Sequence, residues 1–433
     1  MSTLIDFPVK PETRPYLDAF RGIAGEPDWL ERFRRRSLDR FAELGFPGRR
    51  SENWRYLDLQ PLAKNPLLPA ARGHETVVPA ELLIEGRGVR LVLVDGRFAP
   101  KLSRLDLPEG VWLGSMQRAI AELPELVRAA LEDIAQPFAA LNAAFFADGF
   151  VLDVAPGVVI DQPIEIVHLA SAAGSLHTRS LINLGAGSRM TVLETYIGPS
   201  ENNARYWRND VAAWQLGEGA SLTRVALVEE GADAVHLGEV AATIGAGATL
   251  DGFVLLLGGD TVRHEASVTM TGDHAHCRLD GAFIVAGREE ANIVTTIDHT
   301  AIGGTTSELI KGVAAGRAHG AFQGKIIVRE GAQQTDARQT SRNLILGRRA
   351  VIDTKPELEI LADDIKCAHG ASVGELDEAA LFYLRARGIP TEEARRLLVE
   401  GFLREAVDGI AHPAIREHLL GRLGARLARL ESE

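Results

Sequence analysis

The chain has 433 residues, of which 46% are hydrophobic and 24% are charged, and its formal net charge at pH 7 is −12. This length predicts two or three structural units, and the composition is typical of an ordinary globular protein. The negative charge argues against nucleic acid as a partner, because phosphates would repel a chain without a local basic patch. We find no such patch, since the arginines at 32–36 and 422–429 fit the solvated faces of helices.

Cysteine usage and hydrophobicity indicate the compartment. The two cysteines, Cys277 and Cys367, give no disulfide framework and fit a reducing environment. Residues 1–6 lack the charged and then apolar pattern of a signal peptide. The longest apolar run, 253–257, is far too short to span a bilayer. We therefore expect a cytoplasmic protein that does not enter the membrane.

The first part of the chain, residues 1–150, predicts a helical and mixed α/β region. Residues 1 to about 12 fit a disordered tail. A Trp- and Tyr-containing stretch at 51–59 is expected to fix the helical arm to the body of the protein, and a ligand site is the alternative. Helices are expected near Arg14–Ile23, Asp28–Leu44, Ser115–Ala121, Glu125–Leu131 and 136–146, and the clearest strand is Val89–Val94.

Glycine-rich turns recur from about Leu181 to Ile360 and dominate the middle of the chain. They return roughly every 13–17 residues, so that two segments form a coil of roughly 27–32 residues, a spacing typical of solenoids. The intervening segments alternate apolar and polar residues, and stacked coils share a core that no single strand can bury. We predict a mainly β fold, with a right-handed parallel β-helix or β-solenoid core over 151–374. A β-sandwich is the alternative.

The hydrophobic period changes abruptly after the solenoid. Apolar residues at i, i+3 and i+4 replace the alternation, which predicts a C-terminal helical subdomain over 375–433. Thr391 is expected to cap the second of its helices. The predicted helices are Leu376–Arg387, Thr391–Ile410 and about Ala414–Leu430.

The sequence carries no signature of an enzyme. It has no Walker-type phosphate loop, no Gly-x-Ser-x-Gly elbow and no His-Glu-x-x-His motif. A carbohydrate-active β-helix enzyme would need paired carboxylates along a groove lined with aromatic residues. Aromatic residues make up only 6% of the chain, which argues against that alternative.

Two clusters carry candidate metal ligands. The first is His274-Ala275-His276-Cys277, where both imidazoles would lie on one side of an extended segment because strand side chains alternate. A self-contained metal-binding solenoid centred on His274, His276 and Cys277 is one interpretation, and a solvent-exposed turn is the other.

The second cluster contains Cys367 and His369, which share a face of any strand by the same rule. A thiolate beside an imidazole suits a soft metal, and the neighbouring Lys366 would favour the thiolate. Two ligands cannot hold an iron–sulfur cluster, so a partner chain would have to supply the rest. A buried structural cysteine and a packed histidine are the alternative.

Several segments, one of them around this second cluster, carry motifs of a known family. They are 353–371, 381–389, 299–300, 311–313, 322–326, 332–337 and 51–59. These segments resemble the SufB/SufD family of iron–sulfur cluster assembly scaffold proteins. The resemblance covers nearly the whole chain, and the C-terminal motif is long enough to be specific.

Two departures favour the SufD branch of this family. SufB-type chains read approximately His-Glu-Ala-Thr-Thr-Ser where this chain has 369–374, and they carry a cysteine where this chain has Ser341. The resemblance implies a non-catalytic scaffold subunit that pairs with a SufB-type subunit and supports iron and sulfide delivery. A homodimer of this chain is an alternative assembly.

The resemblance also implies site residues. His369 and Cys367, which both stand in the matching motif, would help hold a nascent iron–sulfur cluster shared with the partner at the subunit junction. No cofactor would be held tightly by this chain alone. A SufC-type ABC ATPase would dock on the C-terminal helical subdomain, although helix packing and solvated charge are the alternative roles for the residues concerned. These candidate ATPase contacts are Phe382, Tyr383, Arg385 and Arg387.

Overall fold

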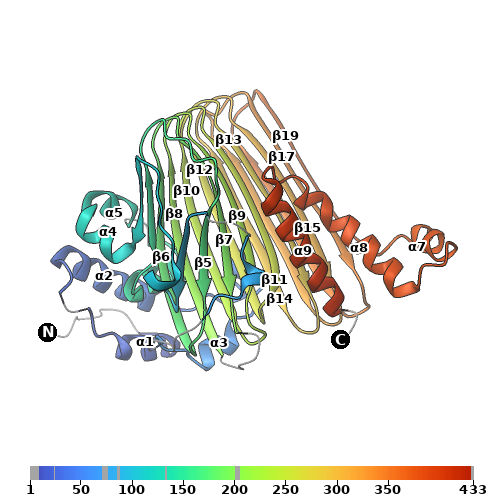
Figure 1. The fold of residues 1–433 in the computed structure, drawn as a ribbon, viewed down its shortest axis with the longest axis horizontal. Coiled ribbons are helices and arrows are strands. Elements are labelled where there is room, and N and C mark those ends of the chain that lie inside the picture. Colours follow the sequence, from blue (N-terminus) through green and yellow to red (C-terminus); the bar gives the residue numbers. More distant parts are fainter. Residues whose placement is uncertain are drawn as a thin grey trace.

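The computed structural model describes residues 9–23, 25–70, 77–84, 88–131, 134–199 and 205–430. Most of the predicted N-terminal tail lies outside these residues, and a short 3-10 helix begins at Pro11. Figure 1 shows a long solenoid of two sheets, with one group of helices against its first coils and a second group along its last coils.

Two large sheets form the walls of the solenoid. The first has ten strands, in the order β19-β17-β15-β13-β11-β9-β7-β5-β1-β2, and the second has nine, in the order β18-β16-β14-β12-β10-β8-β6-β4-β3. The strands of the first sheet are β1 (Arg90–Val94), β2 (Arg97–Phe98), β5 (Ile164–Leu169), β7 (Arg189–Ile197), β9 (Ser221–Glu229), β11 (Thr249–Gly258), β13 (His276–Val285), β15 (Thr305–Ala314), β17 (Thr335–Ile345) and β19 (Ile365–Gly374). Those of the second are β3 (Val111–Ser115), β4 (Phe150–Val154), β6 (Gly174–Leu184), β8 (Tyr206–Leu216), β10 (Val235–Ile244), β12 (Thr261–Met270), β14 (Glu290–His299), β16 (His319–Val328) and β18 (Val351–Ile360).

The connectivity confirms the predicted β-solenoid. From β4 onward the chain alternates between the sheets, and each strand pairs in parallel with the strand two positions later. Val235 pairs with Thr261 and His319 with Val351, so one coil takes about 26 to 32 residues. A sandwich of antiparallel strands is therefore the wrong alternative.

One row of corners is held by a ladder of backbone hydrogen bonds. Gly187, Gly219 and Gly247 have φ between 60° and 68°, the left-handed region that glycine adopts easily. The amide of each donates to a carbonyl of the next coil at 2.8 Å. His274 (φ 57°) and Gln334 (φ 62°) occupy equivalent corners, so this row tolerates other residues at a cost in backbone strain.

The corner geometry predicts the effect of a single methyl group. Gly247→Ala should lower the free energy of unfolding by about 1 kcal/mol, because alanine resists positive φ although no atom lies within 4 Å of its new Cβ. Gly331→Ala is the matched control, since that glycine also has free space but lacks a positive φ. Urea unfolding of the three proteins measures the difference, and equal stabilities would contradict the strain argument.

The space between the sheets is apolar at many positions but contains a buried charged network in the first coils. Arg208 binds Glu230 at 2.6 Å, and His236 Nδ1 lies 2.9 Å from the same carboxylate. Arg224 pairs with Glu194 in the adjacent layer. Each of these ions has its partner within the core, as burial of charge requires.

The N-terminal helices cover the outer face of the nine-stranded sheet around its first coils (Figure 1). Helix α2 has the predicted bounds and ends at Gly45, whose φ is 66°. Helix α1 stops at Ala19 rather than Ile23, because Phe20 is already extended and Gly22 has positive φ. The elements are η1 (Pro11–Thr13), α1 (Arg14–Ala19), α2 (Asp28–Leu44), η2 (Glu52–Trp54), α3 (Gln60–Lys64), η3 (Ala80–Leu82), η4 (Pro100–Leu102), α4 (Met116–Glu122), α5 (Pro124–Ala130) and α6 (Pro137–Phe145).

The segment around Trp54 fixes the N-terminal region to the solenoid, as predicted. The Trp54 ring is buried, and the Arg263 guanidinium of β12 lies 4.1 Å from its centroid. Lys355 of β18 binds Glu52 at 2.7 Å. Gln323 of β16 donates to the carbonyl of Asn53 at 3.3 Å. These contacts involve three strands of the nine-stranded sheet. They support the prediction that the segment around Trp54 fixes the helical arm to the body of the protein.

Three C-terminal helices follow the last strand: α7 (Glu378–Arg385), α8 (Thr391–Val407) and α9 (Pro413–Leu430). The Asp377 carboxylate caps α7 by accepting from the Ala379 amide at 2.8 Å. The predicted Thr391 cap is wrong, because Pro390 is the N-cap residue of α8 and no side chain caps that helix. Pro390 is extended, with ψ at 149°, so that Thr391 is already in the first turn.

Ion pairs attach α8 and α9 to the outer face of the ten-stranded sheet. Arg422 and Arg429 bind Glu229 of β9 at 2.7 and 3.0 Å. Lys311 of β15, whose side chain is buried, pairs with Glu405 and donates to the carbonyl of Phe402. These contacts join the two helices to β9 and β15, which are three strands apart in the sheet. Over the described part of the chain, no helix is long and apolar enough to cross a membrane.

Candidate functional site: an open sheet end and an exposed helical arm

The solenoid ends in two strands that have a neighbour on one side only. β19 is the terminal strand of the ten-stranded sheet and β18 that of the nine-stranded sheet. Along β19 the residues from Ala368 to Gly374 are all exposed. An uncovered edge of this kind presents unpaired backbone groups to which another strand can add.

Cys367 and His369 lie on this last strand and share a face, as the alternation predicts. Cys367 pairs with Ala337 of β17 and His369 with Gln339, and both partners are buried. Cys367 is half-buried and packs against the small apolar cluster that includes Ala337 and Ala362. His369 is exposed. The two side chains therefore belong to the interior-facing row of the outermost coil.

The expected activation of the Cys367 thiol by Lys366 is wrong for this chain. Burial raises the pKa of Cys367 above its usual value, and the Asp336 carboxylate adds to that effect. Lys366 follows the opposite alternation on the strand and pairs in register with Asp336. In this structure the Cys367 thiol packs against the small apolar cluster, whereas the His369 imidazole is accessible.

Within the described ranges, no three His, Cys, Asp or Glu side chains converge closely enough to hold a metal ion. The first candidate cluster, His274-Ala275-His276-Cys277, is dispersed by the fold. His274 occupies a corner in the left-handed conformation, and His276 lies 2.7 Å from the Thr305 hydroxyl. Cys277 points into the core and is fully buried, which raises its pKa strongly. The self-contained metal site is therefore wrong.

Helix α7 forms an arm with an aromatic surface. Phe382 is 72% exposed and Tyr383 is 56% exposed, whereas Leu381 is buried and makes the packing contact. The Arg387 guanidinium lies 3.4 Å from the Tyr383 ring centroid and donates to its carbonyl, and Arg385 is also exposed. Figure 1 shows α7 standing away from the sheets at the end of α8. Helix packing therefore does not account for Phe382 and Tyr383.

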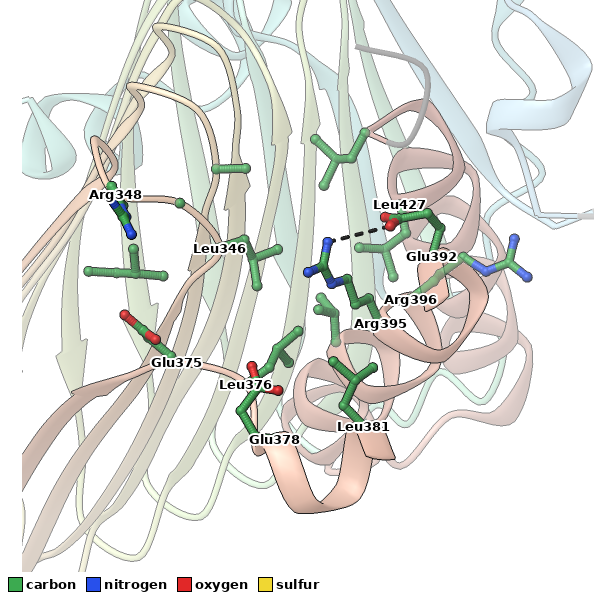
Figure 2. A pocket seen from close by; sticks show the side chains of 15 residues that line it. Leu346, Arg348, Glu375, Leu376, Glu378, Leu381, Glu392, Arg395, Arg396 and Leu427 are labelled. Atoms are coloured by element: carbon green, nitrogen blue, oxygen red, sulfur yellow. Dashed lines mark hydrogen bonds and ion pairs between the residues drawn. The ribbon is translucent and has the colours of Figure 1, made fainter. Parts of the chain in front are cut away.

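A groove of about 400 Å³ separates this arm from the solenoid. Figure 2 shows its apolar floor and its charged rim, where Arg395 and Glu392 form an ion pair at 3.4 Å. No sequence motif indicated this groove, because its walls are brought together from β17, α7, α8 and α9. The floor includes Leu346, Leu376, Leu381 and Leu427, and the rim includes Arg348, Glu375 and Glu378.

Comparison with known proteins identifies the family to which this chain belongs. A model of the SUF system FeS cluster assembly SufBD core domain matches residues 167–402, and a model of the SufBD N-terminal region matches 23–166. The chain belongs to the SufBD family. The carbohydrate-active alternative is set aside, because these two SufBD models together cover the helical region, the solenoid and most of α8.

Curated members of the SufBD family resemble the chain along most of its length. Iron-sulfur cluster assembly protein SufD of Escherichia coli is 28% identical over 90% of this chain and 91% of its own length. Protein slr0076 of Synechocystis, a SufBD family protein, is 30% identical over 89% and 88%. SufD of Bacillus subtilis is 26% identical over 94% and 95%. The chain is thus a SufBD-family homologue of SufD, as the sequence motifs predicted.

Proposed function

We propose that this chain is a non-catalytic scaffold subunit of a cytoplasmic SUF assembly complex. It pairs with a SufB-type subunit through β18 and β19 and docks a SufC-type ATPase on its C-terminal helical subdomain, 375–433. Iron and sulfide then meet at the junction, where His369 is a ligand of the nascent cluster. The observation that carries the proposal is an uncovered sheet end bearing an accessible histidine, in a member of the SufBD family.

The open end supports pairing with a homologous solenoid. Both sheets end together, so a partner with the same two-sheet cross-section would continue both walls and satisfy both edges at once. A second copy of this chain could make the same contact, which is the alternative assembly. A SufB-type partner is favoured because this chain offers only His369 as an accessible ligand on the strand, and cluster assembly needs further ligands.

The C-terminal helices support a mechanical role. Ion pairs join α8 and α9 to the solenoid, whereas α7 packs on α8 and lies across the groove from β17. An ATPase that holds α7 would therefore pull on coils close to the open end. ATP binding can drive such a movement only if the closed ATPase contacts the two arrangements differently.

The proposal predicts the behaviour of His369→Ala. Co-expression with SufB-type and SufC-type subunits should yield an intact complex whose visible cluster absorption, measured anaerobically, falls at least severalfold because one ligand is missing. His276→Ala is the control, since that histidine lies on a different coil away from the junction. Failure to recover either partner would overturn the assembly, and an unchanged chromophore would overturn the role of His369.

A further inference from the structure

A row of polar side chains runs along the inside of the ten-stranded sheet to its open end. Glu308 of β15 pairs in register with Gln339 of β17, and Gln339 pairs with His369 of β19. In-register side chains of neighbouring parallel strands lie on the same face, and the strands are about 4.8 Å apart. Glu308 and Gln339 are buried, whereas His369 is exposed. The row therefore connects the interior of the solenoid with the accessible histidine.

Glu308 gives this row a fixed inner end. Its Oε2 accepts a hydrogen bond from Nε2 of Gln339 at 2.5 Å. Among the described residues no cation pairs with this carboxyl group, and burial raises its pKa to about 7. The Asp280 carboxylate adds to that rise, whereas the Thr295 hydroxyl and the Gln339 amide oppose it. The ionised and the protonated form both keep an oxygen that can accept from Gln339, so the bond does not depend on the charge of Glu308.

The bond to Glu308 sets the direction of the Gln339 amide. β17 lies between β15 and β19, and the N–H group of the amide is directed to the β15 side. The Oε1 oxygen of the same planar group is therefore turned away from Glu308. This oxygen is buried and has no hydrogen-bond partner among the described residues. Buried carbonyl oxygens in native proteins are nearly always hydrogen-bonded, so a donor is missing at this position.

The facing sheet offers no side-chain donor at this level. Gly324 of β16 leaves the space that the Gln339 amide fills, because a Cβ at Gly324 would collide with Nε2. Pro356 of β18 pairs in register with Gly324, and neither residue has a side-chain donor. The Thr354 hydroxyl also lacks a partner among the described residues, but it lies two residues before Pro356. His369 is the neighbour of Gln339 in the remaining direction.

His369 carries a donor that suits this oxygen. A neutral imidazole has one N–H group, and no hydrogen bond to a described residue holds the exposed ring. Histidines that bind metals almost always donate their other ring N–H to a carbonyl or carboxylate oxygen. We propose that Gln339, held by Glu308, is a positioning residue that accepts this N–H and leaves the second ring nitrogen of His369 free for a metal. The tautomer follows from Gln339, whereas its use in cluster binding rests on the proposed function.

Nitrogen-15 NMR of the full chain tests this assignment, because the shifts of the two ring nitrogens report which one carries the hydrogen. His369→Ala identifies the signals. At about pH 8 an ordinary imidazole is neutral, and the wild-type ring should then favour one tautomer. Gln339→Leu should change the ratio of tautomers about fivefold, which corresponds to one ordinary hydrogen bond. Asn343→Leu is the matched control, since Asn343 is a buried amide of the same strand that pairs with Val373 instead of His369.

Two substitutions of Glu308 separate hydrogen bonding from packing. Glu308→Gln keeps an oxygen that can accept from Gln339, so it should retain the wild-type ratio of tautomers. Glu308→Leu removes that acceptor and releases the amide, so it should change the ratio in the same way as Gln339→Leu. A ratio that is equally altered, or equally unaltered, in both Glu308 variants would overturn the role of Glu308.

The outcomes separate the positioning role from the proposed function. A wild-type ring with the tautomer ratio of a free peptide spanning 365–374 overturns the proposal, even if Gln339→Leu fails to fold. An equal change in the Gln339 and Asn343 variants overturns it as well. A tautomer that depends on Gln339 supports it, and none of these measurements requires a partner subunit or a cluster. An unchanged cluster absorption in the complex of His369→Ala would overturn the ligand role and leave the hydrogen bond standing.

Discussion

Acidification from pH 7.5 to pH 5 is expected to lower the free energy of unfolding by about 4 kcal/mol. Burial lowers the pKa of His168 and His177 to about 3 and that of His299 to about 4, and it lowers the pKa of His264 as well. These rings stay neutral in the fold but take up protons near pH 6.5 once the chain unfolds. The unfolded state therefore binds more protons, and stability falls as the pH falls.

Buried carboxyl groups with a raised pKa, Glu308 and Asp280 among them, oppose this trend and reduce its size. Burial raises the pKa of Glu308 to about 7 and that of Asp280 to about 6. A raised carboxyl pKa contributes stability at low pH, which is lost as the pH rises through the folded value. For these six groups the four histidines outweigh the two carboxyl groups, so their net proton uptake on unfolding near pH 5.5 should be about two protons.

Urea unfolding at the two pH values, combined with proton uptake measured by titration, checks this expectation. His177→Phe should flatten the pH dependence by about one proton, because it removes one buried imidazole and keeps a ring beside Phe145. His276→Phe is the control, since its side chain is only half-buried at the surface of the sheet. A pH-independent stability, or an unaltered slope in His177→Phe, would contradict the role of the buried histidines.

Replacing both exposed aromatic residues of α7, Phe382→Ala with Tyr383→Ala, is expected to weaken binding of a SufC-type ATPase at least about 30-fold. The reason is that aromatic side chains at the centre of an interface carry about 2 kcal/mol or more each when they are hot spots. The fold should be unaffected, because neither side chain belongs to a buried cluster of the described residues.

Calorimetric titration with the purified ATPase and thermal unfolding of the chain measure these two quantities. Ile302→Ala is the matched control, because Ile302 is 43% exposed at a solenoid corner away from the arm. Binding that is retained in the α7 variant, or lost equally in the control, would place the ATPase elsewhere. A large fall in the melting temperature would show instead that α7 packs on the body of the protein.

The repeated glycines made the solenoid predictable, because a corner at a regular interval constrains the strands on either side. The pairing of charged side chains inside the solenoid was not predictable from the sequence in this way. Alternation shows that Glu194 and Arg224 lie on one face of their strands, but both faces of these strands are buried, one by the opposite sheet and one by α9. The sequence alone therefore does not distinguish charges that pair between coils from solvated ones.

The candidate site illustrates where local rules hold and where they fail. The two-residue period placed Cys367 and His369 correctly because both lie within one regular strand. It failed for His274 and His276 because His274 itself occupies a corner with positive φ, whereas His276 begins the strand β13. The state of the Cys367 thiol depends on how much of it β17 covers, and the groove beside α7 depends on four elements, so neither follows from neighbouring residues.

In a solenoid each coil contacts only its neighbours, so the coils on either side stabilise its ordered structure. Internal coils have two such neighbours, whereas the coil that ends in β19 has one. The strand that carries His369 is therefore supported by a neighbouring strand on one side only until another chain completes it. In the proposed complex, pairing with the partner subunit would also order His369, so the proposed ligand would be in place only when the partner is bound.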